Sequence, residues 1–182
     1  ADDVTAFPIM DFREALEKRF ETDAHFCPYV VRLANGTIPE EMPRCNTSSL
    51  QALQEQGCQI EFHALVIDVD DPVAHEHNRR HPENKTDARD QWRDEQLNLV
   101  DELPGHLLEG LGRYDTRGGY RLVWGLNKPL SVVEYLQTMA ALRNELRKSD
   151  IDADELKDWT RLYRLPRVKR DGSNEERELE LS

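Results

Sequence analysis

A short apolar run that ends in acidic residues constrains this chain more than any other segment. Residues 63–72 read His-Ala-Leu-Val-Ile-Asp-Val-Asp-Asp-Pro. The apolar residues before the first acid are rich in β-branched side chains and predict a buried strand over residues 60–69. Side chains two apart on a strand point to the same face, so Asp68 and Asp70 would project side by side from the end of this strand.

These neighbouring carboxylates need a positive partner, because like charges at short range are unfavourable. Hard divalent cations such as Mg²⁺ and Mn²⁺ prefer oxygen ligands and commonly fill this role. The pattern therefore favours a metal site and phosphoryl or nucleotidyl transfer. The alternative is structural, with acids that end a strand and Asp71-Pro72 opening a turn. Two acids on one face after a Val-Ile run favour the metal.

The size and composition of the chain predict one domain with a modest core. Its 182 residues can bury a core of useful size, although only 38% are hydrophobic and 33% are charged. No apolar run approaches the roughly 18 residues of a membrane span, and no basic-then-apolar signal segment opens the chain. We therefore expect no membrane partner. The chain begins at Ala1 without Met and stops among charged residues, so we expect a domain excised from a longer protein.

Cysteine usage predicts a reducing compartment. The three cysteines, Cys27, Cys45 and Cys58, are sparse and odd in number, which is typical of the cytoplasm rather than of a disulfide framework. A zinc site built from them with His25 or His63 is the alternative. The chain has no Cys-x-x-Cys pair, so we expect ordinary thiols instead of zinc.

The charge of the chain is unevenly distributed. A formal net charge of −12 argues against a protein that coats DNA over its whole surface. Residues 161–170, however, contain five cations and no acid. This basic track is compatible with phosphate contact at one face, and the alternative is a solvated basic loop.

The pattern of apolar residues and turn signals predicts a mixed succession of helices and strands. We expect helices over residues 11–20, 46–56, 85–103 and 132–148, the second with Thr47 or Ser48 as N-cap and Gly57 as its stop. Strands are expected within 26–33 and over 60–69 and 120–124, with a loop over 71–86 and a strand or short connection over 107–111. Residues 158–165 are expected to form either a strand or a helix followed by a strand, and a charged tail follows Gly172. This order predicts an α+β or split β–α–β fold rather than a doubly wound sheet.

Two further segments carry candidate functional residues. Gly118 and Gly119 precede the strand over 120–124, and paired glycines let backbone approach a ligand closely. Arg121 on that strand would suit bidentate phosphate contact, unless the segment is only a tight turn into an edge strand. Later in the chain, acids at 150–155 precede Arg161-Leu-Tyr-Arg-Leu-Pro. One of these acids could complete a metal site, or they could mark a helix N-terminus.

Taken in order, the three segments resemble the archaeo-eukaryotic primase superfamily, specifically its primase-polymerase branch. That family has an acid-x-acid strand end, a Gly-rich segment that leads into a strand, and a third acid upstream of Arg-Leu-Pro. The matching stretches here are 66–70, 117–124 and 151–166, and the resemblance spans about residues 26–172. It implies a single α+β catalytic domain over 1–182, with an RRM-like antiparallel or mixed sheet and flanking helices.

The resemblance also implies roles for individual residues. Asp68, Asp70 and a third acid, Asp152 or alternatively Asp154, would hold two Mg²⁺ or Mn²⁺ ions. The residues implied to bind the nucleotide are Gly118, Gly119, Arg121, Arg161 and Arg164. Those that we expect to contact nucleic acid are Arg167, Lys169 and Arg170.

The chain departs from the family pattern at two places. Arg121 stands where the family has a strand histidine, and an arginine can bind phosphate but cannot act as a neutral imidazole. After the proline, the family's Gly-Thr-x-Asn-x-Lys is replaced by residues 167–172, Arg-Val-Lys-Arg-Asp-Gly. Both departures concern the nucleotide pocket and leave the acid pair intact.

The expected function is template-directed nucleotidyl transfer by a DNA primase, a DNA polymerase or both. The expected partners are a DNA template and primer, a dNTP or NTP, and possible helicase or accessory helical domains elsewhere in the full-length protein. One alternative is a metal-dependent nuclease or replication initiator, because His75-Glu76-His77 is similar to the histidine pair of rolling-circle nucleases. A second is a nucleotide- or nucleic-acid-binding module with altered activity, which the missing histidine favours.

Overall fold

A five-stranded antiparallel sheet forms the centre of the protein in a computed structural model, which describes residues 6–43, 46–71, 87–151, 153, 158–170, 172–177 and 179–181. The strand order is β11-β6-β7-β5-β3. These strands are β3 (Tyr29–Arg32), β5 (Gln59–Asp70), β6 (Leu111–Asp115), β7 (Gly119–Leu130) and β11 (Leu179–Leu181). With its helices, the sheet confirms the predicted α+β class.

The two longest strands, β5 and β7, pair along most of their length and place the candidate residues. Strands β5 and β6 both run antiparallel to β7, so they are parallel to each other with β7 inserted between them. Helices α4 (Asp87–Asp101) and α5 (Gly105–Leu108) connect β5 to β6. The connection is therefore a split β–α–β arrangement, as the order of elements predicted.

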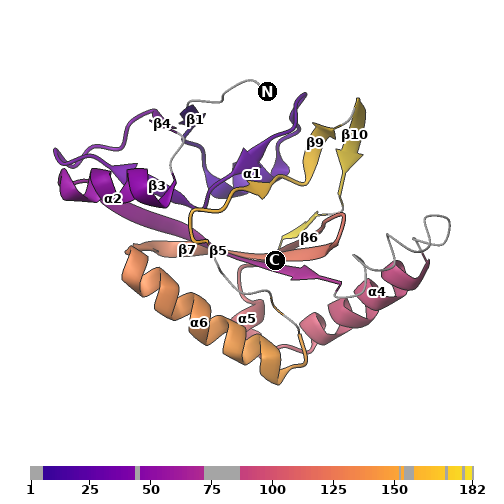
Figure 1. The fold of residues 1–182 in the computed structure, drawn as a ribbon. Helices are drawn as coiled ribbons and strands as arrows, with labels where there is room; N and C mark the ends of the chain where they lie inside the picture. The colour runs from indigo at the N-terminus through magenta and orange to yellow at the C-terminus, as the bar shows by residue number, and fades with distance from the viewer. Residues whose placement is uncertain are drawn as a thin grey trace.

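One face of the sheet is covered by helices. In Figure 1, α4, α5 and α6 (Val132–Lys148) lie together on one side of β5 and β7. Ser131 begins α6 with a capping box that includes Glu134. Phe62 on β5 stacks against Tyr135 on α6, with ring centroids 3.7 Å apart. Both rings are fully buried, so this contact anchors the helical layer to β5.

A second, smaller layer lies on the opposite face. It contains α1 (Phe12–Glu17), the pair β2 (His25–Phe26) and β8 (Tyr163–Arg164), and the hairpin β9 (Arg167–Arg170) and β10 (Ser173–Glu176) (Figure 1). Leu16, Phe26, Leu165 and Val168 from this layer pack with Val66 of β5 in one hydrophobic cluster. The face of β5 that carries Val66 is therefore buried under chain segments from both termini.

The remaining N-terminal elements flank the sheet. Strands β1 (Ala6–Pro8) and β4 (Glu41–Pro43) pair with each other. Helix α2 (Thr47–Glu55) is capped by Asn46, one residue before the predicted cap, because the Asn46 side chain accepts from the Ser49 amide and completes a capping box. Gly57 follows this helix with φ +86°, as expected for the predicted stop.

Several predicted boundaries differ from the structure. Predicted helix 132–148 matches α6, whereas residues 107–111 contain the end of helix α5 and the start of β6. The charged tail after Gly172 contributes β10 and β11. Leu179 and Leu181 of β11 pack at the edge of the second layer, which explains why so polar a segment joins the sheet.

Most of the predicted loop, residues 72–86, lies outside the described residues. Among the helices described, none has the length and apolar character that crossing a membrane requires.

Candidate active site

The candidate site centres on Asp68, near the end of the long strand β5. Register with β7 is continuous from Ala64 to Asp70, so Asp68 and Asp70 share the face that carries Val66. The Asp68 side chain is only 4% exposed, because the second layer covers this face. Asp70 is half-buried. A carboxylate as buried as that of Asp68 requires charge compensation from its surroundings.

Arg121 supplies this compensation from the neighbouring strand. It lies directly opposite Asp68 in the register of β5 and β7, and its Nε donates to Asp68 Oδ1 at 2.5 Å. Its Nη1 donates to the Tyr114 hydroxyl and to the Arg164 carbonyl, each at 2.9 Å. The Tyr114 hydroxyl in turn donates to the same carbonyl at 2.9 Å. Arg121 is therefore held by three strands at once.

Aromatic rings complete the surroundings of Arg121. Its guanidinium carbon lies 5.4 Å from the ring centroid of Tyr114 and 5.1 Å from that of Tyr163. Burial raises the pKa of both Tyr114 and Tyr163 to about 12. Burial lowers the pKa of Arg121, but Tyr114 and Asp68 outweigh this effect and leave it raised. The site therefore holds a permanent cation beside Asp68.

Arg161 approaches the other oxygen of Asp68. Its Nη2 lies 2.9 Å from Oδ2, although Oδ2 accepts no hydrogen bond of ordinary geometry from the described residues. The Arg161 side chain is 46% exposed, compared with 8% for Arg121. Its guanidinium carbon also lies 5.7 Å from the ring centroid of Tyr163. The two arginines therefore differ in kind, because one is part of the core and the other reaches in from the surface.

The glycine pair brings β7 against the end of β5. A Cβ at Gly119 would lie 2.0 Å from the Val69 carbonyl oxygen, and one at Gly118 would lie 2.8 Å from Asp70 Oδ1. The Gly118 carbonyl accepts from the Asp71 amide at 2.9 Å. The Gly119 amide donates to Thr116 Oγ1 at 3.0 Å. The sequence predicted a close backbone approach to a ligand at these glycines, whereas in the structure the close approach is made to β5, beside the Asp70 carboxylate.

The remaining predicted basic residues lie in or next to the second layer. The Arg164 side chain binds Asp23 through two hydrogen bonds of 2.7 and 2.9 Å. Arg167 donates to the carbonyl of Glu17 at the end of α1, and Lys169 on β9 is exposed. Arg170 ends the same strand. The structure thus brings Arg121 and Arg161 to Asp68, and it directs the Arg164 side chain to Asp23.

Several candidate ligands lie outside the described residues. They are the two candidate third acids Asp152 and Asp154, the loop histidines His75 and His77, and Cys45. Within the described ranges, no group of three or more His, Cys, Asp and Glu side chains could hold a metal ion. The Cys27 thiol lies 3.7 Å from the Tyr29 carbonyl oxygen.

Two carboxylates on one face of β5, those of Asp68 and Asp70, have the chemistry of divalent-cation ligands. Asp68 Oδ2 is a buried oxygen that lacks a hydrogen bond from the described residues, and Asp70 lies two residues away on the same face. Carboxylate oxygens are the ligands that Mg²⁺ and Mn²⁺ prefer. Asp68 Oδ1 is engaged by Arg121, so Asp68 would contribute Oδ2. The donor set therefore fits a hard divalent cation, with further ligands required from outside these two residues.

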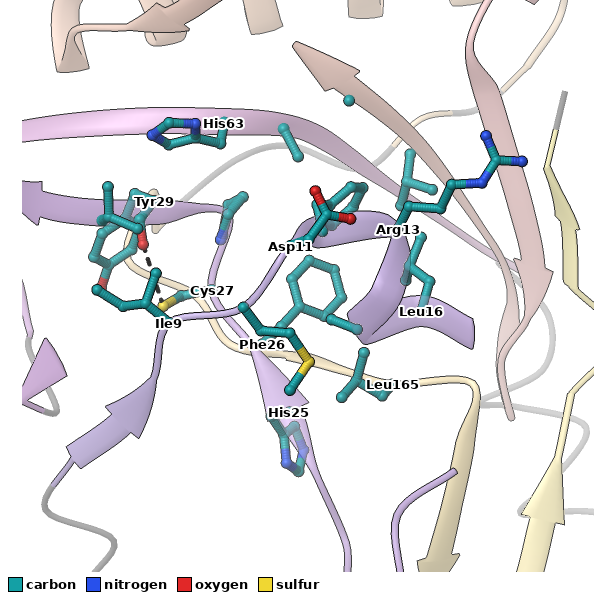
Figure 2. A pocket seen from close by; sticks show the side chains of 18 of the residues that line it. Ile9, Asp11, Arg13, Leu16, His25, Phe26, Cys27, Tyr29, His63 and Leu165 are labelled. Atoms are coloured by element: carbon teal, nitrogen blue, oxygen red, sulfur yellow. Dashed lines mark hydrogen bonds between the residues drawn. The ribbon is translucent and has the colours of Figure 1, made fainter. Parts of the chain in front are cut away.

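A separate pocket of about 1110 Å³ occupies the same sheet face farther along β5 and β7. Its walls include Asp11, Arg13 and Phe26 from the N-terminal segment, together with His63 of β5 and Leu165 (Figure 2). Ala64, Val123 and Gly125 also line it. None of the residues predicted to bind metal, nucleotide or nucleic acid in the primase-polymerase scheme, within the described part of the chain, is among its lining residues, although His25, Cys27 and His63 of the alternative zinc set are. The pocket is therefore distinct from the cluster around Asp68.

Sequence reasoning missed the two tyrosines that hold Arg121. Tyr163 lies between the predicted Arg161 and Arg164, so its position offered a usable signal. Tyr114 became relevant only through the pairing of β6 with β7, which places it opposite Arg121. The predicted strand over 107–111 did not reach Tyr114. Comparison of the chain with protein-family models, curated proteins and solved structures finds no match.

Proposed function

We propose that this chain carries out template-directed nucleotidyl transfer, as a DNA primase, a DNA polymerase or both. One observation carries the proposal: three segments far apart in sequence meet at a single buried carboxylate. Asp68 comes from β5, Arg121 from β7, and Arg161 from the segment before β8. These are the segments whose order and spacing resemble the primase-polymerase family. Metal-assisted phosphate chemistry uses carboxylates that hold the metal and nearby arginines that can reach a phosphate, and these residue types meet at this site.

In this proposal, Asp68 and Asp70 hold Mg²⁺ or Mn²⁺ together with a third acid, Asp152 or Asp154. When bound, such ions activate an attacking hydroxyl and neutralise charge on a triphosphate. Arg161, which reaches the site from the surface, contacts the triphosphate. Arg121 and Tyr114 hold the Asp68 carboxylate in place. The split β–α–β core supports an RRM-like catalytic sheet, which is the fold implied by the resemblance.

The proposed substrates are a DNA template, a primer or initiating nucleotide, and a dNTP or NTP. The basic track over 161–170 supports contact with the template backbone, because Lys169 is exposed on β9 and Arg167 lies on the same strand. A helicase or accessory helical domain is a proposed partner within a longer protein.

The test is incubation with a primed template, Mn²⁺ and a labelled dNTP. We expect extended primers from the wild type and at least a 100-fold loss for Asp70→Asn. Asp70 is the better first target because it is half-buried, whereas Asp68→Asn also disturbs a buried ion pair. Asp101→Asn, an exposed aspartate paired with Arg113, is the matched control and should retain activity. Full incorporation by Asp70→Asn would contradict the proposal.

A second candidate is a nucleotide- or nucleic-acid-binding module without catalysis. It is favoured by the ion pair with Arg121, which engages one oxygen of the acid that would hold the metal. This candidate predicts nucleotide or DNA binding without incorporation, and binding that Asp70→Asn leaves unchanged. Nicked template without extension in the same assay would indicate a nuclease instead.

A further inference from the structure

The two arginines at Asp68 are held in very different ways. Arg121 is 8% exposed and donates to Asp68, Tyr114 and the Arg164 carbonyl. Arg161 is 46% exposed and reaches Oδ2 at 2.9 Å without hydrogen-bond geometry. Moving Arg121 would break several buried contacts, whereas Arg161 can turn into solvent at small cost. Of the two arginines, Arg161 is therefore the one that can leave Asp68 and contact another anionic group.

We propose that Arg161 is an internal counter-ion that occupies the cation position at Asp68 Oδ2 until a triphosphate arrives. The inference rests on the proposed function and adds a regulatory step to the same site. A divalent cation and Arg161 cannot both approach Oδ2 closely, because like charges at such a distance repel. A nucleoside triphosphate, which is strongly anionic, offers Arg161 a better partner than a single carboxylate oxygen.

The exchange makes metal binding and nucleotide binding mutually dependent. Without nucleotide, Arg161 competes with the cation for Oδ2 and weakens its binding. With nucleotide, Arg161 moves to the phosphates and releases Oδ2, so each ligand favours the other. The buried Arg121 pair keeps the Asp68 carboxylate oriented during the exchange. In the absence of nucleotide, Arg161 also compensates the buried charge of Asp68, which would be costly if Oδ2 had no cation nearby.

The test measures Mn²⁺ alone and then nucleotide, using Arg161→Gln. Binding of Mn²⁺ without nucleotide is followed by electron paramagnetic resonance of the free ion. We expect the Mn²⁺ Kd to fall by about three- to tenfold in Arg161→Gln, because a competing charge is removed. At saturating Mn²⁺, the Kd of a fluorescent dATP analogue should rise by about tenfold, because a phosphate contact is lost. These opposite shifts are not expected from general damage to the fold.

Two matched variants control the experiment. Arg161→Lys keeps the charge and should leave the Mn²⁺ Kd within about twofold of the wild type. Arg13→Gln removes another exposed arginine, one paired with Glu17 on α1, and should change neither Kd. An unchanged or weakened Mn²⁺ affinity in Arg161→Gln would overturn the inference while leaving the proposed function standing if the wild type binds Mn²⁺ and extends primers. Absence of Mn²⁺ binding in both proteins would overturn the inference and the metal-dependent function together.

Discussion

Asp68 and Arg121 face each other across the two longest strands of the sheet, and the Nε of Arg121 lies 2.5 Å from Asp68 Oδ1. Both side chains are more than nine-tenths buried. The chain itself therefore supplies a positive partner for Asp68, because Arg121 neutralises the carboxylate through Oδ1. The second oxygen lies 2.9 Å from Arg161 Nη2, and it is the oxygen to which we propose that a divalent cation binds.

Loss of Arg121 should destabilise the protein strongly. Arg121→Met leaves Asp68 buried without its main partner, and we expect a loss of about 3–5 kcal/mol in the free energy of unfolding. Arg161→Met, which removes the exposed partner, should cost no more than about 1 kcal/mol. Urea denaturation measures both. The double variant Asp68→Leu/Arg121→Met should recover most of the loss, and failure to do so would mean that Arg121 acts mainly through Tyr114 and Tyr163.

The hydroxyl of Tyr114 should contribute measurably to stability. It accepts from Arg121 and donates to the Arg164 carbonyl, both at 2.9 Å. Tyr114→Phe should therefore lower the free energy of unfolding by about 1–2 kcal/mol. Tyr120 is the matched control, because it is equally buried but its hydroxyl has no hydrogen-bond partner among the described residues. Tyr120→Phe should be neutral or stabilising, and equal losses in the two variants would refute this account of Tyr114.

Two glycines on β7 should respond oppositely to alanine. At Gly119 a Cβ would lie 2.0 Å from the Val69 carbonyl oxygen, so Gly119→Ala must push β7 away from β5. We expect a loss of about 2–3 kcal/mol, together with loss of any activity that depends on Asp70. At Gly125 a Cβ meets nothing within 4 Å. Gly125→Ala should leave stability unchanged or raise it by up to about 1 kcal/mol, as thermal and urea unfolding can establish.

Glu61 should make the stability of the protein depend on pH in the acid range. Two hydrogen bonds from Arg32 hold the pKa of Glu61 below its ordinary value of 4.5, and His63 lies 3.7 Å away as a further cation when protonated. Because the folded pKa is the lower one, this contribution is fully present above pH 4.5 and is lost as the pH falls through the folded value. The stability difference between wild type and Glu61→Gln should therefore shrink on acidification.

The measurement is urea unfolding of both proteins at several pH values between about 7 and 3. Arg32→Gln provides the control, because without its main partner Glu61 should titrate near its ordinary pKa. In that background, Glu61→Gln should change stability by nearly the same amount at every pH. A stability difference that grows as the pH falls below 4.5 in the Arg32-containing pair would show that the pKa of Glu61 is raised instead.

Much of the fold followed from local patterns in the sequence. The long helix α6 was predicted with its observed bounds because its apolar residues recur with a helical period within one continuous segment. The acid-ended strand was predicted to within a residue at either end. Strand β11 was missed, because only Leu179 and Leu181 in a charged tail signal it and its pairing partner β6 is distant in sequence.

For the candidate site, the sequence by itself determined that Asp68 and Asp70 share one face at the end of a strand, since the period of a strand is a local property. The sequence also indicated Arg121, Arg161 and Arg164 as candidate nucleotide-binding residues, each in its own segment. Only the tertiary structure decided that Arg121, 53 residues away, pairs with Asp68 while Arg164 turns to Asp23. Strand register and layer packing set such pairs, and both depend on the whole sheet rather than on any one segment.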